Sequence, residues 1–220
     1  MERARPPDAA ALWRRRPLPH PTPVLAFPLD LRFKLIAIAS QISVHDASGR
    51  LICYVKQKAF KLREAVTVFG DEAQTRPLYR IEADRVLDIS AQYHVEDVAT
   101  GATLGVVQRR GMRSFWRAHY EVLRDGRLVF TIQEENPWVK MFDSLVGELP
   151  IIGMFTGYLL HPAYRVSRAG GDEPVLRAVK QPAFFEGRYR VESPGALSDD
   201  DERLALLAIL MMLLLERQRG

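Results

Sequence analysis

The sequence predicts a mainly β protein: a closed antiparallel barrel of about 12 strands around a central hydrophobic C-terminal α-helix, with one extra amphipathic helix. Two observations support this fold class. Short runs of alternating apolar and polar residues recur at the spacing of roughly 8 to 12 residues that is typical of barrels and sandwiches. In addition, Leu204–Leu215 is an uninterrupted run of 12 apolar residues, so a helix there has no polar face.

Residues 1–32 are expected to form a disordered arm that is rich in proline and arginine. Half of the chain's 14 prolines lie within the first 28 residues, where they fix φ and remove backbone donors. Trp13 followed by Arg14–Arg16 is the one cluster in the arm that could bind an anionic surface. We therefore place the barrel domain at residues 33–220.

Turn residues separate the strands that the barrel requires. Asp46–Gly49 and Asp125–Gly126 lie between apolar runs and are typical of β-hairpin turns. Such runs give about ten to twelve strands. The clearest are Ile42–Val44, Leu51–Val55, Thr67–Phe69, Leu78–Ile81, Ile89–Val95, Thr103–Gln108, Ala118–Leu123, Leu128–Gln133, Tyr164–Ser167, Pro174–Val179 and Phe184–Val191.

One segment between strands has helical periodicity. Asn136–Pro137 can cap a helix, because proline is tolerated at the first helical position. The apolar residues from Trp138 to Leu149 then recur at three- and four-residue intervals. This pattern predicts an amphipathic helix that ends near Pro150.

The second helix is expected at about residues 198–217. Ser198 or an aspartate after it can cap the helix, Asp199–Glu202 lie at its positive end, and Arg217 lies at its negative end. Because its middle is apolar all round, it must be enclosed on every side. Its apolar part is roughly 18 Å long at 1.5 Å per residue, which matches a short strand, so a closed barrel can surround it. A two-layer sandwich ranks second, since it would leave one side of this helix in water.

Charge and composition exclude several classes of protein. The 31 basic and 27 acidic residues give a net charge of +4. Residues 1–33 hold six arginines and three acidic residues, which accounts for +3 of that total. A barrel with so little net charge is not expected to bind nucleic acid. Cys53 is the single cysteine, so no intramolecular disulfide can form.

The chain shows neither a secretory signal nor a membrane span in its sequence. The 12-residue apolar run is shorter than the roughly 20 residues of a spanning helix. The N-terminus lacks the apolar core of a signal peptide. We expect a cytoplasmic protein that stays in the cytosol or lies at the membrane periphery.

Enzyme motifs are missing from the sequence, so no catalytic residue, metal ligand or cofactor is assigned. There is no G-x-S-x-G, Walker, H-E-x-x-H or dinucleotide-binding glycine motif. Glu134 and Glu135 are adjacent in a predicted strand, so at most one of them can face a given site. The acidic run Asp199–Glu202 fits helix capping better than calcium binding, because consecutive carboxylates on a helix do not converge on one ion.

Two basic stretches are the candidate binding residues. Guanidinium and ammonium groups can bind lipid phosphates, while aromatic side chains enter the headgroup boundary. The candidates are Lys56, Lys58, Lys61, Arg63, Arg109, Arg110, Arg113, Phe115 and Trp116. The alternative is that the aromatic residues pack beneath the loop and the arginines are merely solvated. The apolar stretch 149–160 is expected to pack at the barrel mouth rather than to insert into a membrane.

Several segments resemble the tubby C-terminal-like superfamily, in particular its LURP-one-related and phospholipid-scramblase-like branches. The resemblance covers about residues 33–217 and rests on residues 42–51, the basic stretch 56–63 and the apolar terminal helix. Residues 133–140 resemble the signature of a bacterial subgroup. The resemblance implies a twelve-stranded barrel around the C-terminal helix. Activities attributed to the superfamily include phosphoinositide binding and calcium-linked lipid scrambling, but this chain lacks the scramblases' cysteine-rich segment and spanning helix.

These observations favour a non-enzymatic binding module that associates peripherally with anionic lipid or phosphoinositide membranes. Electrostatic attraction and shallow insertion of aromatic residues would supply the affinity. The alternative is a protein-interaction scaffold with an unidentified partner, which would use the Trp138 helix and residues 151–160. A third interpretation places an enzyme site inside the barrel mouth.

Overall fold

Twelve strands and one long helix make up the described part of the chain. The computed structural model describes residues 24–36, 39–58, 65–84, 91–110, 119–135, 162–182 and 187–217. The strands are β1 (Leu29–Ile36), β2 (Ala39–His45), β3 (Leu51–Lys58), β4 (Val66–Phe69), β5 (Pro77–Ala83), β6 (Gln92–Asp97), β7 (Thr103–Arg109), β8 (His119–Arg124), β9 (Arg127–Glu134), β10 (Ala163–Arg168), β11 (Pro174–Gln181) and β12 (Gly187–Glu192). The helix is α4 (Asp199–Arg217).

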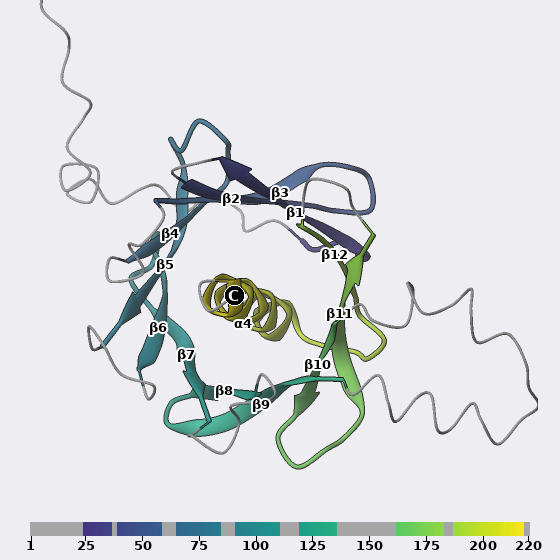
Figure 1. Ribbon diagram of the computed structural model, residues 1–220. Coiled ribbons are helices and arrows are strands. Elements are labelled where there is room, and N and C mark those ends of the chain that lie inside the picture. Colours follow the sequence, from purple (N-terminus) through teal and green to yellow (C-terminus); the bar gives the residue numbers. More distant parts are fainter. Residues whose placement is uncertain are drawn as a thin grey trace, which may run out of the picture.

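The strands close into an antiparallel barrel. Each strand pairs with the next one along the chain, and β1 pairs with β12 through residues such as Leu29 and Val191. Figure 1 shows the barrel from one end, so that the strands form a ring. Closure gives every described strand a partner on both sides, and a strand without a second partner would invite pairing with other chains.

Alternation along each strand builds the core. In β1, Leu29, Leu31 and Phe33 are almost completely buried, whereas the residues between them face outward. In Figure 1, α4 is seen inside the ring. Its residues from Leu204 to Leu214 are all buried, which is how a helix without a polar face avoids water.

Polar contacts hold the first turn of α4. The backbone N–H of Asp201 donates a hydrogen bond to the Ser198 hydroxyl over 3.3 Å, so Ser198 is the N-cap. Asp201 also accepts a hydrogen bond of 2.8 Å from Arg124 at the end of β8. The predicted cap and helix span therefore agree closely with the structure.

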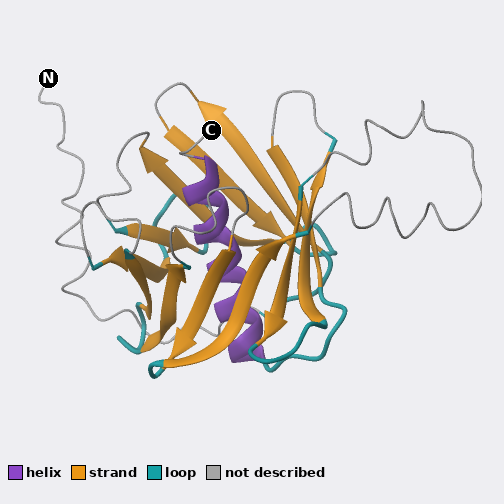
Figure 2. Ribbon diagram, turned by 60° about the horizontal axis from the view of Figure 1, so that its bottom comes forward, coloured by secondary structure: helices purple, strands orange, loops and turns teal. Residues whose placement is uncertain are grey.

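The two ends of the barrel differ. Strand β8 runs from Tyr120, which contacts the last turn of α4, to Arg124, which contacts its first turn. We call the end where α4 begins the base and the end where it finishes the mouth. Five strand-to-strand turns lie at the base, all within the described residues, and Figure 2 shows them gathered around the start of the helix. Asp125 and Gly126 form the tightest of them, both with positive φ, as a two-residue hairpin requires.

Two expectations about the organisation of the chain meet different outcomes. Strand β1 begins at Leu29, so four residues that we assigned to the arm belong to the barrel. The prolines end at Pro28, and from there Leu29 and Leu31 alternate with polar residues as a strand demands. The expected amphipathic helix at residues 138–149 lies outside the described residues.

Candidate functional site

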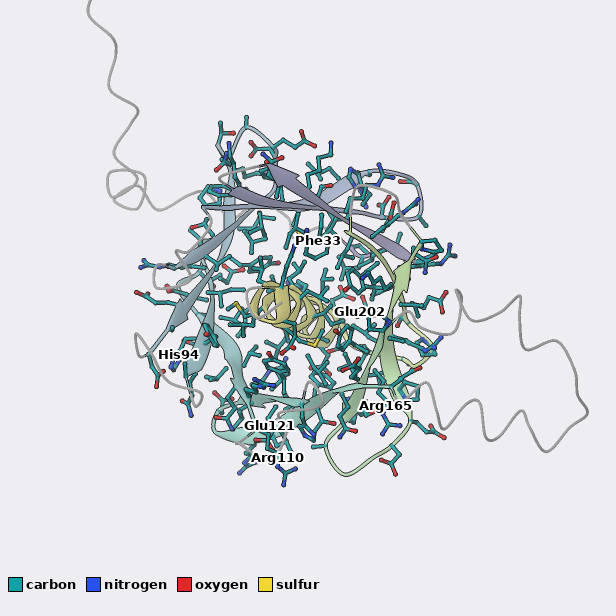
Figure 3. The ribbon with its side chains drawn as sticks, viewed as in Figure 1. Phe33, His94, Arg110, Glu121, Arg165 and Glu202 are labelled. Carbon is teal, nitrogen blue, oxygen red and sulfur yellow. The ribbon has the colours of Figure 1, made fainter. Side chains whose placement is uncertain are left out.

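Arg109 and Arg110 face opposite sides of the barrel wall. Arg109 is the last residue of β7 and pairs with the buried Tyr120, so its side chain faces inward. Arg110 follows the strand, and its side chain is 65% exposed with Nε 3.4 Å from Oε1 of Glu121. Figure 3 shows Arg110 and Glu121 together on the outer side. The two arginines therefore cannot act as one outer patch.

Of the other basic candidates, Lys56 alone has a described side chain. Lys56 is exposed on β3, two residues before the strand ends at Lys58. Four strand-to-strand steps separate β3 from β7, so Lys56 and Arg110 occupy different sectors of the same rim. The side chain of Lys58 and the whole of Lys61, Arg63, Arg113, Phe115 and Trp116 lie outside what the structure describes.

A polar ladder on the outer wall joins Arg110 to neighbouring strands. The Gln92 amide donates to Gln108 over 2.9 Å, and the Gln108 amide donates to Glu121 over 3.0 Å. His119 lies beside this ladder, where burial and the Arg110 charge lower its pKa. The ladder fixes the Glu121 carboxylate next to Arg110, so part of the arginine's charge is already balanced.

Three cross-strand pairs line the inner wall of the mouth in a repeating pattern. Each pair sets a charged residue near the end of one strand directly opposite a tyrosine on the next strand. The pairs are Arg109–Tyr120, Glu134–Tyr164 and Lys180–Tyr189. The inward positions two residues earlier are buried and apolar: Val107, Ile132 and Ala178. Because alternate residues share a face, the charged residues face into the barrel. We call these six residues the mouth ring.

The last turn of α4 enters the mouth ring. The Tyr120 hydroxyl donates a hydrogen bond to Oε1 of Glu216 over 2.5 Å. The guanidinium of Arg217 lies 5.3 Å from the centre of the Phe33 ring, a cation–π contact with β1. Figure 3 shows Phe33 on the inner side of the barrel. Gly187 leaves room for this contact, because a Cβ there would lie 3.2 Å from Nη1 of Arg217.

Burial and neighbouring groups raise the pKa values of the tyrosines in the mouth ring. Burial raises the pKa of Tyr120, and the hydrogen bond to Glu216 raises it further. Burial also raises the pKa of Tyr164, with added contributions from Tyr189, Glu134 and Glu216. The rings of Tyr164 and Tyr189 lie 6.4 Å apart between centres. These tyrosines therefore stay neutral hydroxyl donors at physiological pH.

The two ends of the barrel differ in how their described charged residues are paired. At the base, Asp201 pairs with both Arg124 and Arg168, and Arg203 pairs with Asp200. At the mouth, Glu134 and Lys180 form no ion pair within the part of the chain that the structure describes. Charged side chains that face inward without an opposite charge are unusual, since desolvation favours pairing. Within the described ranges, the mouth is thus the end whose charged groups lack an opposite charge.

Glu134 and Glu135 divide between the two sides, as strand geometry predicted. Glu134 belongs to the mouth ring, whereas Glu135 faces outward and binds Arg177 with two hydrogen bonds of 2.7 and 2.8 Å. Only one of the two carboxylates is available at the mouth.

The described residues bear on two common kinds of reactive site, a metal centre and a reactive cysteine. No group of three or more His, Cys, Asp or Glu side chains that could hold a metal ion occurs there. Burial raises the pKa of Cys53 to about 12, so its thiol stays protonated. No helix in the described ranges is long and apolar enough to cross a membrane.

Sequence reasoning missed most of the mouth ring. Tyr120, Tyr164, Lys180 and Tyr189 were not singled out, because each belongs to an ordinary alternating run. A usable signal was the change at the inward positions from apolar residues to tyrosine or charge near strand ends. It becomes visible only once cross-strand register is known.

Comparisons with known proteins bear on the family. The family model described as LURP-one-related matches residues 51–192, which spans β3 to β12. The X-ray structure of a protein from Arabidopsis thaliana is similar, with 16% sequence identity and a TM-score of 0.46, over 88% of this chain and 93% of that chain. No curated protein sequence matches this chain.

Proposed function

Because this chain belongs to the LURP-one-related family, we propose that it is a non-enzymatic module that binds anionic membrane surfaces with the mouth of its barrel. The observation that carries the proposal is topological. Strands β3 and β7, which lead into the basic stretches 56–63 and 109–117, both finish at the mouth. A flat surface laid across the mouth meets every strand end at once, so basic groups from different sectors of the rim act together.

The composition of the segments that connect the strands also supports the mouth as the membrane-binding end. The base turns, all within the described residues, contain no aromatic residue and are made mainly of small and polar residues such as Asp46–Gly49. The chain between the strands that end at the mouth includes Phe115, Trp116 and Trp138 together with Arg113. Arginine attracts lipid phosphate, and aromatic residues favour the headgroup boundary. These four residues lie outside the described part of the chain, and the proposal assigns them attraction to lipid phosphate and shallow insertion because their segments follow strands that end at the mouth.

The arm enters from the opposite end. Val24 and Ala26 lie beside the base turn between β2 and β3, where the Ala26 carbonyl accepts a hydrogen bond from Ala47 over 3.0 Å. A contribution of Arg14–Arg16 to the same membrane contact would require the arm to run the length of the barrel. The proposal therefore rests on the mouth alone.

Co-sedimentation with vesicles tests the proposal. The full-length protein is mixed with three kinds of vesicle at low and physiological salt. The first is phosphatidylcholine alone, the second contains added phosphatidylserine, and the third contains added phosphoinositide. We expect binding only to the anionic vesicles, weaker at higher salt because screening shortens the electrostatic range.

A charge-reversal pair locates the contact. Arg110→Glu changes an exposed arginine at the mouth, and Arg127→Glu changes an exposed arginine at the base by the same charge. We expect the first to lower the bound fraction several-fold and the second to leave it near wild type. Equal losses would mean binding through net charge alone. If the wild-type protein stays in the supernatant with every lipid, the membrane proposal fails and a protein partner becomes the function to pursue.

A further inference from the structure

The mouth ring contains one carboxylate and one ammonium group whose charges the described chain does not use. Glu134 on β9 and Lys180 on β11 both face inward, and β10 with Tyr164 lies between them. Adjacent strands are about 4.8 Å apart, so the two strands that bear these residues are about 10 Å apart. Neither residue forms an ion pair with the other or elsewhere in the described ranges. Opposite charges thus stand on either side of one tyrosine.

One neutral tyrosine lies on the strand between these charges, and a second lies beside Lys180. Tyr164 is only 7% exposed, yet its hydroxyl has no hydrogen-bond partner within the described residues. Tyr189 stands directly opposite Lys180, and its ring faces that of Tyr164 at an angle of 41°. Phenol hydroxyl groups donate to phosphate oxygens, and phenol ring faces attract cations. The surroundings suit a ligand that carries both signs of charge.

Arg109, the third charged residue of the mouth ring, has an interaction of its own and lies opposite Tyr120. The charges in the last turn of α4 are engaged as well, which sets the orientation of such a ligand. Glu216 accepts the Tyr120 hydroxyl, and Arg217 lies over Phe33. Among the described residues, a cationic group therefore finds an unpaired carboxylate at Glu134, and an anionic group finds an unpaired ammonium at Lys180. Arg217 lies near Tyr189, whose pKa is raised mainly by burial and lowered in part by that guanidinium. This second cation strengthens the side of the mouth that would take the anion.

We infer that the mouth ring binds a zwitterionic amino-phosphate group, with its primary ammonium at Glu134 and its phosphate at Lys180. The inference rests on the proposed function in one respect: a mouth that faces a membrane brings lipid headgroups to the ring. A primary ammonium is specified because it can donate hydrogen bonds to the Glu134 carboxylate, which a quaternary ammonium cannot. The group is either the headgroup of a phospholipid or a free small molecule.

Calorimetric titration with free ligands tests the charge pattern. The probes are phosphoethanolamine, ethanolamine, which lacks the phosphate, and ethyl phosphate, which lacks the ammonium. We expect phosphoethanolamine to bind at least roughly tenfold more tightly than either fragment, because each supplies only one charge-assisted contact. Glu134→Gln should weaken phosphoethanolamine but not ethyl phosphate, and Lys180→Met should weaken phosphoethanolamine but not ethanolamine.

Matched controls separate a local effect from a change of fold or net charge. Glu173→Gln removes an exposed carboxylate at the base, and Lys34→Met removes an exposed ammonium on the outer face of β1. Both should bind phosphoethanolamine as the wild-type protein does. Thermal unfolding of each variant checks that the barrel is intact, and Glu134→Asp and Lys180→Arg, which retain the charges, should restore part of the affinity.

Vesicles distinguish the two sources of the group. Phosphatidylcholine vesicles with added phosphatidylethanolamine are compared with phosphatidylcholine alone for the wild-type protein and for Glu134→Gln. Binding that needs phosphatidylethanolamine and Glu134, without measurable binding of the free probe, assigns the ring to a lipid headgroup. If neither phosphoethanolamine nor phosphatidylethanolamine binds, or if Glu134→Gln and Lys180→Met bind like the wild type, the inference is overturned. Loss of anionic-vesicle binding in Arg110→Glu is independent of these readouts, so the two proposals can fail separately.

Discussion

The hydroxyl group of Tyr120 donates a hydrogen bond to the carboxylate of Glu216, which ties the start of β8 to the last turn of α4. Tyr120 is 1% exposed, so almost the whole side chain lies in the core while its hydroxyl reaches the mouth. The contact sets the depth of the helix in the barrel at one end. At the other end, Arg124 of the same strand binds Asp201. Strand β8 therefore holds both ends of the helix.

Tyr120→Phe should destabilise the protein. The substitution keeps the ring but leaves the Glu216 carboxylate without its donor, which costs about 1–2 kcal/mol in the free energy of unfolding. Urea denaturation followed by circular dichroism measures the change. Tyr189→Phe is the control, because its hydroxyl forms no hydrogen bond among the described residues. Similar losses in both variants would contradict the role of the Tyr120 contact.

Alkaline pH should unfold the barrel through its buried tyrosines. Burial raises the pKa of Tyr79 to about 12 and raises the pKa of Tyr120 and Tyr164 as well. A pKa that is higher in the folded state means that folding favours the neutral phenol. This stabilisation is complete below the ordinary tyrosine pKa of about 10 and is lost as pH rises through the folded values. The unfolding temperature should fall only above about pH 10, together with tyrosinate absorbance; complete ionisation of the tyrosines at pH 10 in a folded protein would rule this out.

Gly105→Ala should weaken the packing of α4 against β7. A Cβ at this position would lie 2.6 Å from the carbonyl oxygen of Leu123 and 3.0 Å from the Leu204 methyl groups. The carbonyl belongs to the backbone and cannot turn away, so we expect a loss of about 1–3 kcal/mol. Gly171→Ala is the matched control, since its nearest neighbour would be 3.8 Å away. Equal unfolding free energies for the two variants would show that β7 yields more easily than the geometry implies.

Asp201→Asn should lower stability more than Asp199→Asn. Both changes remove one negative charge from the first turn of α4, where the helix dipole favours acidic residues. Only Asp201 also binds two arginines, Arg124 at 2.8 Å and Arg168 at 3.5 Å. We expect a difference of about 1 kcal/mol between the variants in chemical denaturation, falling at high salt. A salt-independent difference would point to packing instead.

The Cys53 thiol should report on global unfolding. It is buried on the inner wall of β3, and its pKa of about 12 leaves little thiolate at neutral pH. A thiol reagent should therefore modify the native protein only as fast as it unfolds, and adding urea should accelerate the reaction in parallel with the loss of circular dichroism. Rapid modification without denaturant would mean that the barrel wall opens locally at β3.

Features that depend on local sequence were predicted well. The apolar run 204–215 with its acidic start predicted α4 to within a residue, because capping and a continuous apolar run are properties of one segment. The hairpin at Asp125–Gly126 was found for the same reason. The start of β1 at Leu29 was not predicted, because it follows directly after Pro28, the last proline of the arm.

Features that depend on register were not accessible. The sequence ended one strand at Gln108, whereas β7 continues to Arg109. Because strand side chains alternate, ending the strand one residue early placed Arg109 in an outer loop, whereas its side chain faces the inner wall. Lys180 was likewise placed just past the end of a strand that continues to Gln181. The three charged residues of the mouth ring are such boundary residues, and the direction of their side chains follows from pairing with neighbouring strands.

The order of elements along the chain has a consequence for synthesis on the ribosome. The helix that fills the barrel follows all twelve strands, and β1 can close the ring only when β12 is available. A nascent chain that has released eleven strands still lacks both its closing partner and the apolar surface on which those strands pack. Such a chain exposes the inner faces of its strands for the time that the ribosome needs to add the remaining residues, at a rate of about 5–20 residues per second. Closure of the barrel is therefore deferred until β12 and α4 have been synthesised, and nascent chains arrested before Asp199 should be clients of chaperones that bind apolar strands.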